Sequence, residues 1–165
     1  MKQIINTITE TITVKGIVDE DFVNYKVPSM TIMFPHCDFK CGSYCQNSSL
    51  ANENDIEISV DALVQRFLTN DISEAIVCQG LEPFDSFCDL LSFISVLRES
   101  YNCENDVVIY TGYNKSEIEE EVNELSKFKN IIIKFGRYLP NQDYHFDEIL
   151  GVNLASPNQY AERIS

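Results

Sequence analysis

The chain has 165 residues, 44% of them hydrophobic, and carries a formal net charge of −14 at pH 7. This length and apolar content suit one domain with its own core, so we expect residues 1–165 to fold as a single domain. The negative charge disfavours nucleic acid or an anionic membrane surface as a partner, because both would repel the protein. No apolar run reaches the ~18 residues that a membrane-spanning helix requires, so we expect no membrane segment.

The first predicted elements are two strands and a helix. Residues 4–14 are rich in Ile, Val and Thr with a period of two, which indicates an extended arm or strand. Residues 30–34 form the next predicted strand, which ends just before a cysteine-rich segment. Ser59 is a favourable N-cap for an amphipathic helix that follows it. The apolar face of that helix comprises Val60, Leu63, Val64, Phe67 and Leu68.

The second half of the chain alternates between predicted strands and helices. Strands are expected at residues 75–78, 107–110 and 131–135, and helices at residues 84–99 and 115–127. This order, with short links, predicts a parallel sheet with right-handed crossovers and hence an α/β fold. Because functional loops follow the carboxyl ends of parallel strands, segments 37–45, 79–83 and 111–113 should share one edge of the sheet.

Three cysteines, Cys37, Cys41 and Cys45, lie within nine residues, directly after the strand predicted at residues 30–34. An iron-sulfur cubane needs one thiolate per iron, so three clustered cysteines leave one iron open to a small molecule. A helix would spread these thiols over roughly 12 Å along one face, whereas the glycine, proline and asparagine residues around them favour a loop. We therefore interpret residues 37–45 as a cluster-binding loop.

Other uses of the cysteines remain open. The amino-terminal sequence MKQIINTITE has no apolar stretch of signal-peptide length, so we expect a cytoplasmic protein with reduced thiols rather than disulfides. Structural zinc also takes three cysteines and a histidine, and His36 lies beside Cys37, but the usual two separated ligand pairs are absent. Cys78, Cys88 and Cys103 stand singly in apolar surroundings and are expected to be small buried hydrophobic residues.

The chain resembles the radical S-adenosylmethionine superfamily in several motifs that occur in order. These are the strand and three-cysteine loop, with Tyr44 before the third cysteine, and the turn GLEP at residues 80–83. Within that superfamily it is similar to the activating proteins of anaerobic ribonucleoside-triphosphate reductase over most of its length. Further points of similarity are IYTGY at 109–113, then Gly136, Arg137 and Tyr138, then Asn158 and Gln159, and finally Arg163 and Ile164.

Two features depart from the superfamily pattern. Three residues rather than two separate Cys41 from Cys45, and Gly42 among them can absorb the extra residue at little conformational cost. The second glycine of the usual GGEP turn is Leu81.

The resemblance implies an open partial (β/α) barrel of parallel strands, with the cluster loop after an early strand. It also implies that Cys37, Cys41 and Cys45 hold a [4Fe-4S] cluster whose open iron binds S-adenosyl-L-methionine, which is then cleaved reductively. Tyr44 would pack near the adenine, and Thr111 would add a polar contact. Backbone groups of Gln79, Gly80, Leu81 and Glu82 would receive the methionyl amine.

The implied function is that of a radical S-adenosylmethionine oxidoreductase that generates a glycyl radical on an anaerobic ribonucleotide reductase. An electron donor such as flavodoxin or ferredoxin would reduce the cluster, and no side chain needs to act as acid or base. Two alternatives remain: an activase of a pyruvate formate-lyase type of enzyme, or a non-catalytic interaction module that bears an iron-sulfur cluster or zinc. The chain has no ferredoxin-like cysteine-rich insert, which favours the reductase type.

Overall fold

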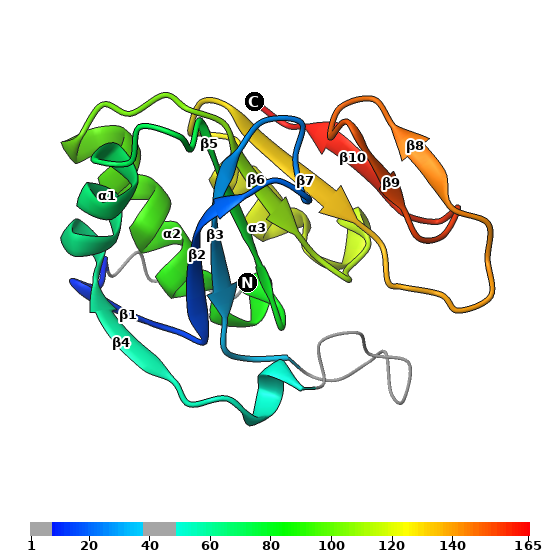
Figure 1. Ribbon diagram of the computed structural model, residues 1–165, viewed down its shortest axis with the longest axis horizontal. Helices are drawn as coiled ribbons and strands as arrows, with labels where there is room; N and C mark the ends of the chain where they lie inside the picture. The colour runs from blue at the N-terminus through cyan, green and yellow to red at the C-terminus, as the bar shows by residue number, and fades with distance from the viewer. Residues whose placement is uncertain (1–7, 38–48) are drawn as a thin grey trace.

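The computed structural model describes residues 8–37 and 49–165, and a six-stranded sheet organises them (Figure 1). The strand order is β10-β7-β6-β5-β3-β2. The four central strands run parallel and are β3 (Ser29–Phe34), β5 (Ala75–Gly80), β6 (Val107–Tyr110) and β7 (Ile131–Phe135). The edge strands β2 (Gly16–Asp21) and β10 (Tyr160–Arg163) are antiparallel to their neighbours. The central strands match the predicted ones, whereas the sequence did not predict the two edge strands.

The central strands are largely apolar because most of their side chains are buried, on both faces of the sheet. In β7, for example, all five residues are buried. Successive side chains point to opposite faces, so Ile131 and Ile133 belong to one hydrophobic core and Ile132 to another.

Three α-helices pack on one face of the sheet (Figure 1). They are α1 (Val60–Leu68), α2 (Phe87–Ser95) and α3 (Glu119–Leu125). Helix α1 begins where predicted, because the Ser59 hydroxyl accepts a hydrogen bond of 3.0 Å from the Ala62 N–H. The expectation that Leu68 faces the core is wrong, since this last residue of α1 is 43% exposed.

The helix predicted at residues 84–99 is divided into three parts. A 3-10 helix, η3 (Pro83–Ser86), precedes α2, and a π-helical turn, η4 (Val96–Ser100), follows it. The helix predicted at 115–127 likewise consists of the 3-10 helix η5 (Lys115–Glu117) and α3. Cys88 is exposed, contrary to expectation, because the fully buried stretch of α2 begins only at Leu90. Cys78 and Cys103 are buried as expected.

A small two-stranded sheet lies beside the helical layer. It pairs β1 (Thr11–Val14) antiparallel with β4 (Ile56–Ser59), and the 3-10 helix η2 (Leu50–Asn52) precedes β4. Ile12 and Val14 of β1 enter the helix-side core. Of the strand predicted at residues 4–14, the structure shows Thr11–Val14 as a strand and residues 8–10 outside it. Residues 4–7 lie outside the described ranges.

The opposite face of the sheet is covered only in part. A hairpin of β8 (His145–Asp147) and β9 (Val152–Leu154) packs there, as does the β2–β3 connection at residues 22–28. Their buried side chains Tyr25, Leu150 and Leu154 contact Val77, Val108 and Ile132 of the sheet. The carboxyl ends of the strands on this face carry polar side chains instead.

No helix within residues 8–37 and 49–165 is long and apolar enough to cross a membrane. Whether the sheet belongs to an open partial barrel stays a prediction. Its two edges are β2 and β10.

Arg98 in the π-helical turn holds together two loops at the amino ends of the central strands. Its guanidinium donates hydrogen bonds to the carbonyls of Cys103 and Asn105, before β6, and of Lys129 and Asn130, before β7. Burial lowers the pKa of Arg98, and nearby charges only partly offset this.

Replacing Arg98 by alanine should therefore lower the free energy of unfolding by about 2 kcal/mol, because several carbonyls lose a charged donor. Urea unfolding of the two proteins measures the difference. Lys127→Ala is the matched control: it removes an exposed ion pair with Glu124, which should cost less than about 1 kcal/mol. Equal effects of the two substitutions would contradict the clamping role of Arg98.

Candidate functional site

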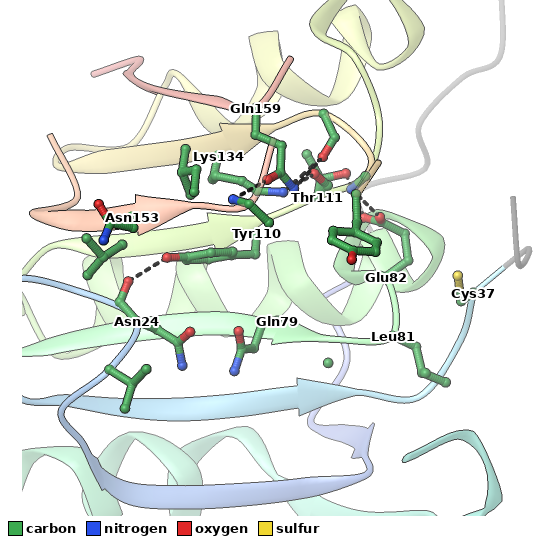
Figure 2. A pocket seen from close by; sticks show the side chains of 18 residues that line it. Asn24, Cys37, Gln79, Leu81, Glu82, Tyr110, Thr111, Lys134, Asn153 and Gln159 are labelled. Carbon is green, nitrogen blue, oxygen red and sulfur yellow. Dashed lines mark hydrogen bonds between the residues drawn. The ribbon is translucent and has the colours of Figure 1, made fainter. Parts of the chain in front are cut away.

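A trough with a volume of about 420 Å³ lies on the partly covered face of the sheet, at the carboxyl ends of β5, β6 and β7 (Figure 2). Cys37 stands at one end of it, and Asn24 and Asn153 stand on opposite sides at the other end (Figure 2). Its floor comes from alternate strand residues that point away from the helices, namely Gln79, Tyr110 and Lys134.

Most of the site residues predicted from the sequence line this trough. They are Cys37, Gln79, Gly80, Leu81, Glu82 and Thr111. The structure therefore brings the end of β3, the turn after β5 and the start of the loop after β6 to one place. Cys41, Cys45 and Tyr44 lie outside the described residues.

Gly80 ends β5 in a conformation that only glycine adopts readily. Its φ is +103°, and an added Cβ would lie 2.6 Å from the backbone nitrogen of Phe34. The next residue, Leu81, donates its N–H to the Phe34 carbonyl at 3.1 Å. The turn after β5 is thus pressed against the end of β3, close to Cys37.

The carboxylate of Glu82 joins the loops around the trough. One oxygen accepts hydrogen bonds from the Thr111 hydroxyl at 2.8 Å and the Phe84 N–H at 3.1 Å. The other accepts from the Gly112 N–H at 2.9 Å. The Glu82 N–H in turn donates to the carbonyl of His36 at 2.7 Å. Glu82 therefore connects the three segments that follow β3, β5 and β6.

These bonds bear on the predicted role of Thr111. Its hydroxyl donates to Glu82 and accepts from the Tyr113 N–H at 3.0 Å, so it already makes two hydrogen bonds within the protein. A cofactor contact from the Thr111 side chain would compete with them. Part of the backbone of residues 79–82, which the sequence predicted as the docking edge, is engaged in the same way: the N–H groups of Leu81 and Glu82 donate to the Phe34 and His36 carbonyls.

Lys134 is a buried cation in the trough that the sequence analysis did not select. The residue is 6% exposed, and its ammonium donates to the carbonyls of Gly136 at 2.9 Å and Thr111 at 3.3 Å. The Lys134 ammonium nitrogen also lies 5.7 Å from the centre of the Tyr110 ring. A charged residue inside the otherwise apolar run IIIKF was the signal that could have identified it.

Tyr110 and Gln159 also contribute polar groups to the trough. The Tyr110 hydroxyl donates to the Asn24 carbonyl at 2.6 Å, and burial raises the pKa of this tyrosine, so it stays neutral. The Gln159 side-chain oxygen accepts from the N–H groups of Ala155 and Ser156, which holds the chain after β9 beside the trough.

The donor set fits an iron-sulfur cluster with a small polar cofactor beside it. The Cys37 thiol is the soft ligand that iron-sulfur clusters require. The trough next to it has the size of a small-molecule pocket. His36, the histidine of the zinc alternative, has an exposed side chain, while its carbonyl accepts the Glu82 N–H.

The family described as a 4Fe-4S single cluster domain matches residues 28–151. This match covers three quarters of the chain, including Cys37, Cys41, Cys45 and all four parallel strands, so the chain belongs to that family. The family finding supports the iron-sulfur interpretation over zinc. Comparison with curated proteins gives no match for the chain.

The buried Glu82 carboxyl predicts a pH dependence of stability. Burial is the main cause that raises its pKa from 4.5 to about 7, against the hydrogen bonds from Gly112, Thr111 and Phe84. The folded chain holds the proton up to about pH 7, whereas the unfolded chain releases it near 4.5. The free energy of unfolding should therefore fall as the pH rises through this window, by up to about 3 kcal/mol.

Urea unfolding of the cluster-free chain at pH 5 and pH 8 measures this fall. Glu82→Gln keeps the shape of the side chain but cannot ionise, so the fall should shrink markedly in that variant. The same pH dependence in both proteins would show that Glu82 does not titrate in this range.

Proposed function

We propose that the protein is a radical S-adenosylmethionine activase that generates a glycyl radical on a partner enzyme, most specifically an anaerobic ribonucleotide reductase. The observation that supports this most directly is the trough, which begins at Cys37 and continues along the turn after β5. In the proposal, Cys37, Cys41 and Cys45 ligate a [4Fe-4S] cluster and the neighbouring part of the trough receives S-adenosylmethionine.

The chain's own groups suit an amino-acid ligand. In the proposal, backbone carbonyl groups of the turn that begins at Gln79, beside Cys37, accept hydrogen bonds from the methionyl amine. Lys134 supplies a positive charge in the same trough, which suits a carboxylate because attraction between charges is stronger where water is excluded. The Glu82 carboxyl group is turned into the loops, so its oxygens face N–H and O–H donors of the protein.

When bound, the reduced cluster would supply the electron that cleaves S-adenosylmethionine into methionine and a 5′-deoxyadenosyl radical, which takes hydrogen from a glycine. The protein's contribution is to bind, orient and exclude water. Gln79 and Lys134 of the polar floor would hold the cofactor, and the partial cover of this face would leave a way in for a partner's glycine loop.

The fold proposal follows from the same arrangement. We infer that the described sheet is part of an open partial barrel whose uncovered side receives the partner. Within the described residues the sheet keeps two edges, β2 and β10, which a closed barrel would not have. The net charge of −14 favours a partner with a basic surface and a complex that weakens as salt increases.

The cluster assignment is tested by iron content. Anaerobic reconstitution should give a brown protein with about four irons per chain, and Cys37→Ala, Cys41→Ala or Cys45→Ala should each lose the cluster. Cys88→Ala is the matched control, because this exposed cysteine does not line the trough. Iron analysis and the visible spectrum measure the result. A colourless protein that binds zinc, or full iron loading of any of the three variants, would contradict the assignment.

The activity is tested by following S-adenosylmethionine. The dithionite-reduced, cluster-loaded protein should release methionine and 5′-deoxyadenosine, and with the anaerobic reductase of the same genome it should produce a glycyl radical signal in electron paramagnetic resonance. A pyruvate formate-lyase type of partner serves as the comparison. If the fully loaded protein cleaved no S-adenosylmethionine, with or without a partner, the activase proposal would be contradicted. The non-catalytic interaction module would then be the remaining function.

Gly80→Ala should reduce this cleavage by about tenfold or more, because the added Cβ displaces the turn from Phe34. Gly16→Ala is its control, since there the added Cβ meets only the flexible end of the Met33 side chain. Iron content should be the same in both variants.

A further inference from the structure

The most exposed large hydrophobic side chains of the described residues belong to two segments. Phe22 and Val23, in the β2–β3 connection, are 68% and 75% exposed. Tyr144 and Phe146, at the start of the β8–β9 hairpin, are 74% and 61% exposed. Both segments lie on the partly covered face of the sheet. Exposed apolar side chains that gather at one place commonly mark a binding surface.

Both segments border the trough at the end far from Cys37. Val23 itself lines the trough. Phe146 pairs directly with Asn153 across the hairpin, and Asn153 also lines the trough. Residues directly opposite in an antiparallel pair point to the same face, with Cβ atoms about 5 Å apart. Figure 2 shows Asn24 and Asn153 on the two sides of this end. The exposed apolar side chains therefore continue the trough outward on both sides.

The two segments are anchored, so the exposed side chains are held in place before any partner binds. In the hairpin, the Asp147 carboxylate accepts hydrogen bonds from the N–H groups of Leu150 and Ala161. In the β2–β3 connection, the Asp21 carboxylate accepts from the Val23 N–H at 2.8 Å and the Thr31 hydroxyl at 2.6 Å. Prior ordering of a binding surface reduces the entropy lost on association.

The charged residues next to the hairpin aromatics in the sequence are acidic. Asp143 and Glu148 are exposed and flank Tyr144 and Phe146 in the sequence. An apolar centre with an acidic border suits a partner surface that has apolar side chains and basic residues around them.

We propose that Phe22, Val23, Tyr144 and Phe146, with the acidic border of Asp143 and Glu148, form the docking surface for the protein that carries the target glycine. The partner's glycine loop lies along the trough toward Cys37, and the apolar and basic residues beside that loop cover the docking surface. This inference rests on the proposed function, because it assigns the far end of the same trough to the partner and the Cys37 end to the cofactor.

The test compares two double variants of the cluster-loaded protein. Tyr144→Ser with Phe146→Ser removes the hairpin side of the docking surface. Leu68→Ser with Ile72→Ser is the matched control, because these residues are also exposed and apolar but do not line the trough. The probe is the purified anaerobic ribonucleotide reductase of the same genome, and binding is measured by sedimentation across a salt series.

The hairpin variant should bind the reductase at least about tenfold more weakly than the parent. Its cleavage of S-adenosylmethionine without the partner should stay unchanged, because Tyr144 and Phe146 do not line the trough. Val23→Asp, on the other side, should weaken binding similarly, and the control variant should bind like the parent. Lysine or arginine substitutions at Asp143 and Glu148 should flatten the salt dependence.

Unchanged reductase binding in the hairpin variant, with cleavage intact, would overturn the docking surface and leave the proposed function standing. Loss of a dimer of this chain in the hairpin variant, with reductase binding unchanged, would also overturn it and assign the surface to a second copy. Absence of S-adenosylmethionine cleavage in the parent protein would instead overturn the proposed function, and this inference with it.

Discussion

The carboxylate of Glu82 is the interaction on which the geometry of the site depends. A buried carboxyl group is costly to keep in the protein interior, and this one is only 5% exposed. The cost is partly offset because three donors from the loops after β5 and β6 converge on its two oxygens. If Glu82 moved, these loops would lose their common partner and the chain after β3 would lose the N–H bound to His36.

The sheet separates two environments by the alternation of its strands. Side chains on the helix side form a continuous apolar core, whereas on the other face the apolar contacts end before the strands do. There the alternate positions become Gln79, Tyr110 and Lys134, and the cover formed by the β2–β3 connection and the β8–β9 hairpin leaves room for a ligand. The same strands thus supply stability along most of their length and polar groups at their ends.

The sequence predicts the parallel strands well because their apolar runs are short, continuous and bounded by turn residues. Residues 107–110 and 131–135, for instance, coincide with β6 and β7. The prediction of one helix at residues 84–99 is only partly confirmed. A periodic apolar pattern does not reveal that a 3-10 helix begins at Pro83 or that a π-helical turn begins at Val96. The antiparallel edge strands were missed because their exposed side chains weaken the alternation that would identify them.

The site is predicted unevenly for a similar reason. A cluster of cysteines is recognisable from spacing, and the family match supports the iron-sulfur centre. The link from Glu82 to Thr111 spans two strands, and nothing in local sequence indicates it. Exposed aromatic residues such as Phe146 look like core residues in the sequence, so only the three-dimensional arrangement shows that they border the trough.

The position of Arg98 has a consequence for how such a protein can evolve. Its hydrogen bonds join the loops that precede β6 and β7, whereas the trough lies where those strands end. The length of each strand therefore separates this clamp from the residues that would meet a ligand. Mutations can accumulate at the ligand end, and change what is bound there, without disturbing the contacts that close the opposite end of the domain. Variation at the Arg98 end can then be selected for folding, and variation at the trough end for the choice of ligand or partner.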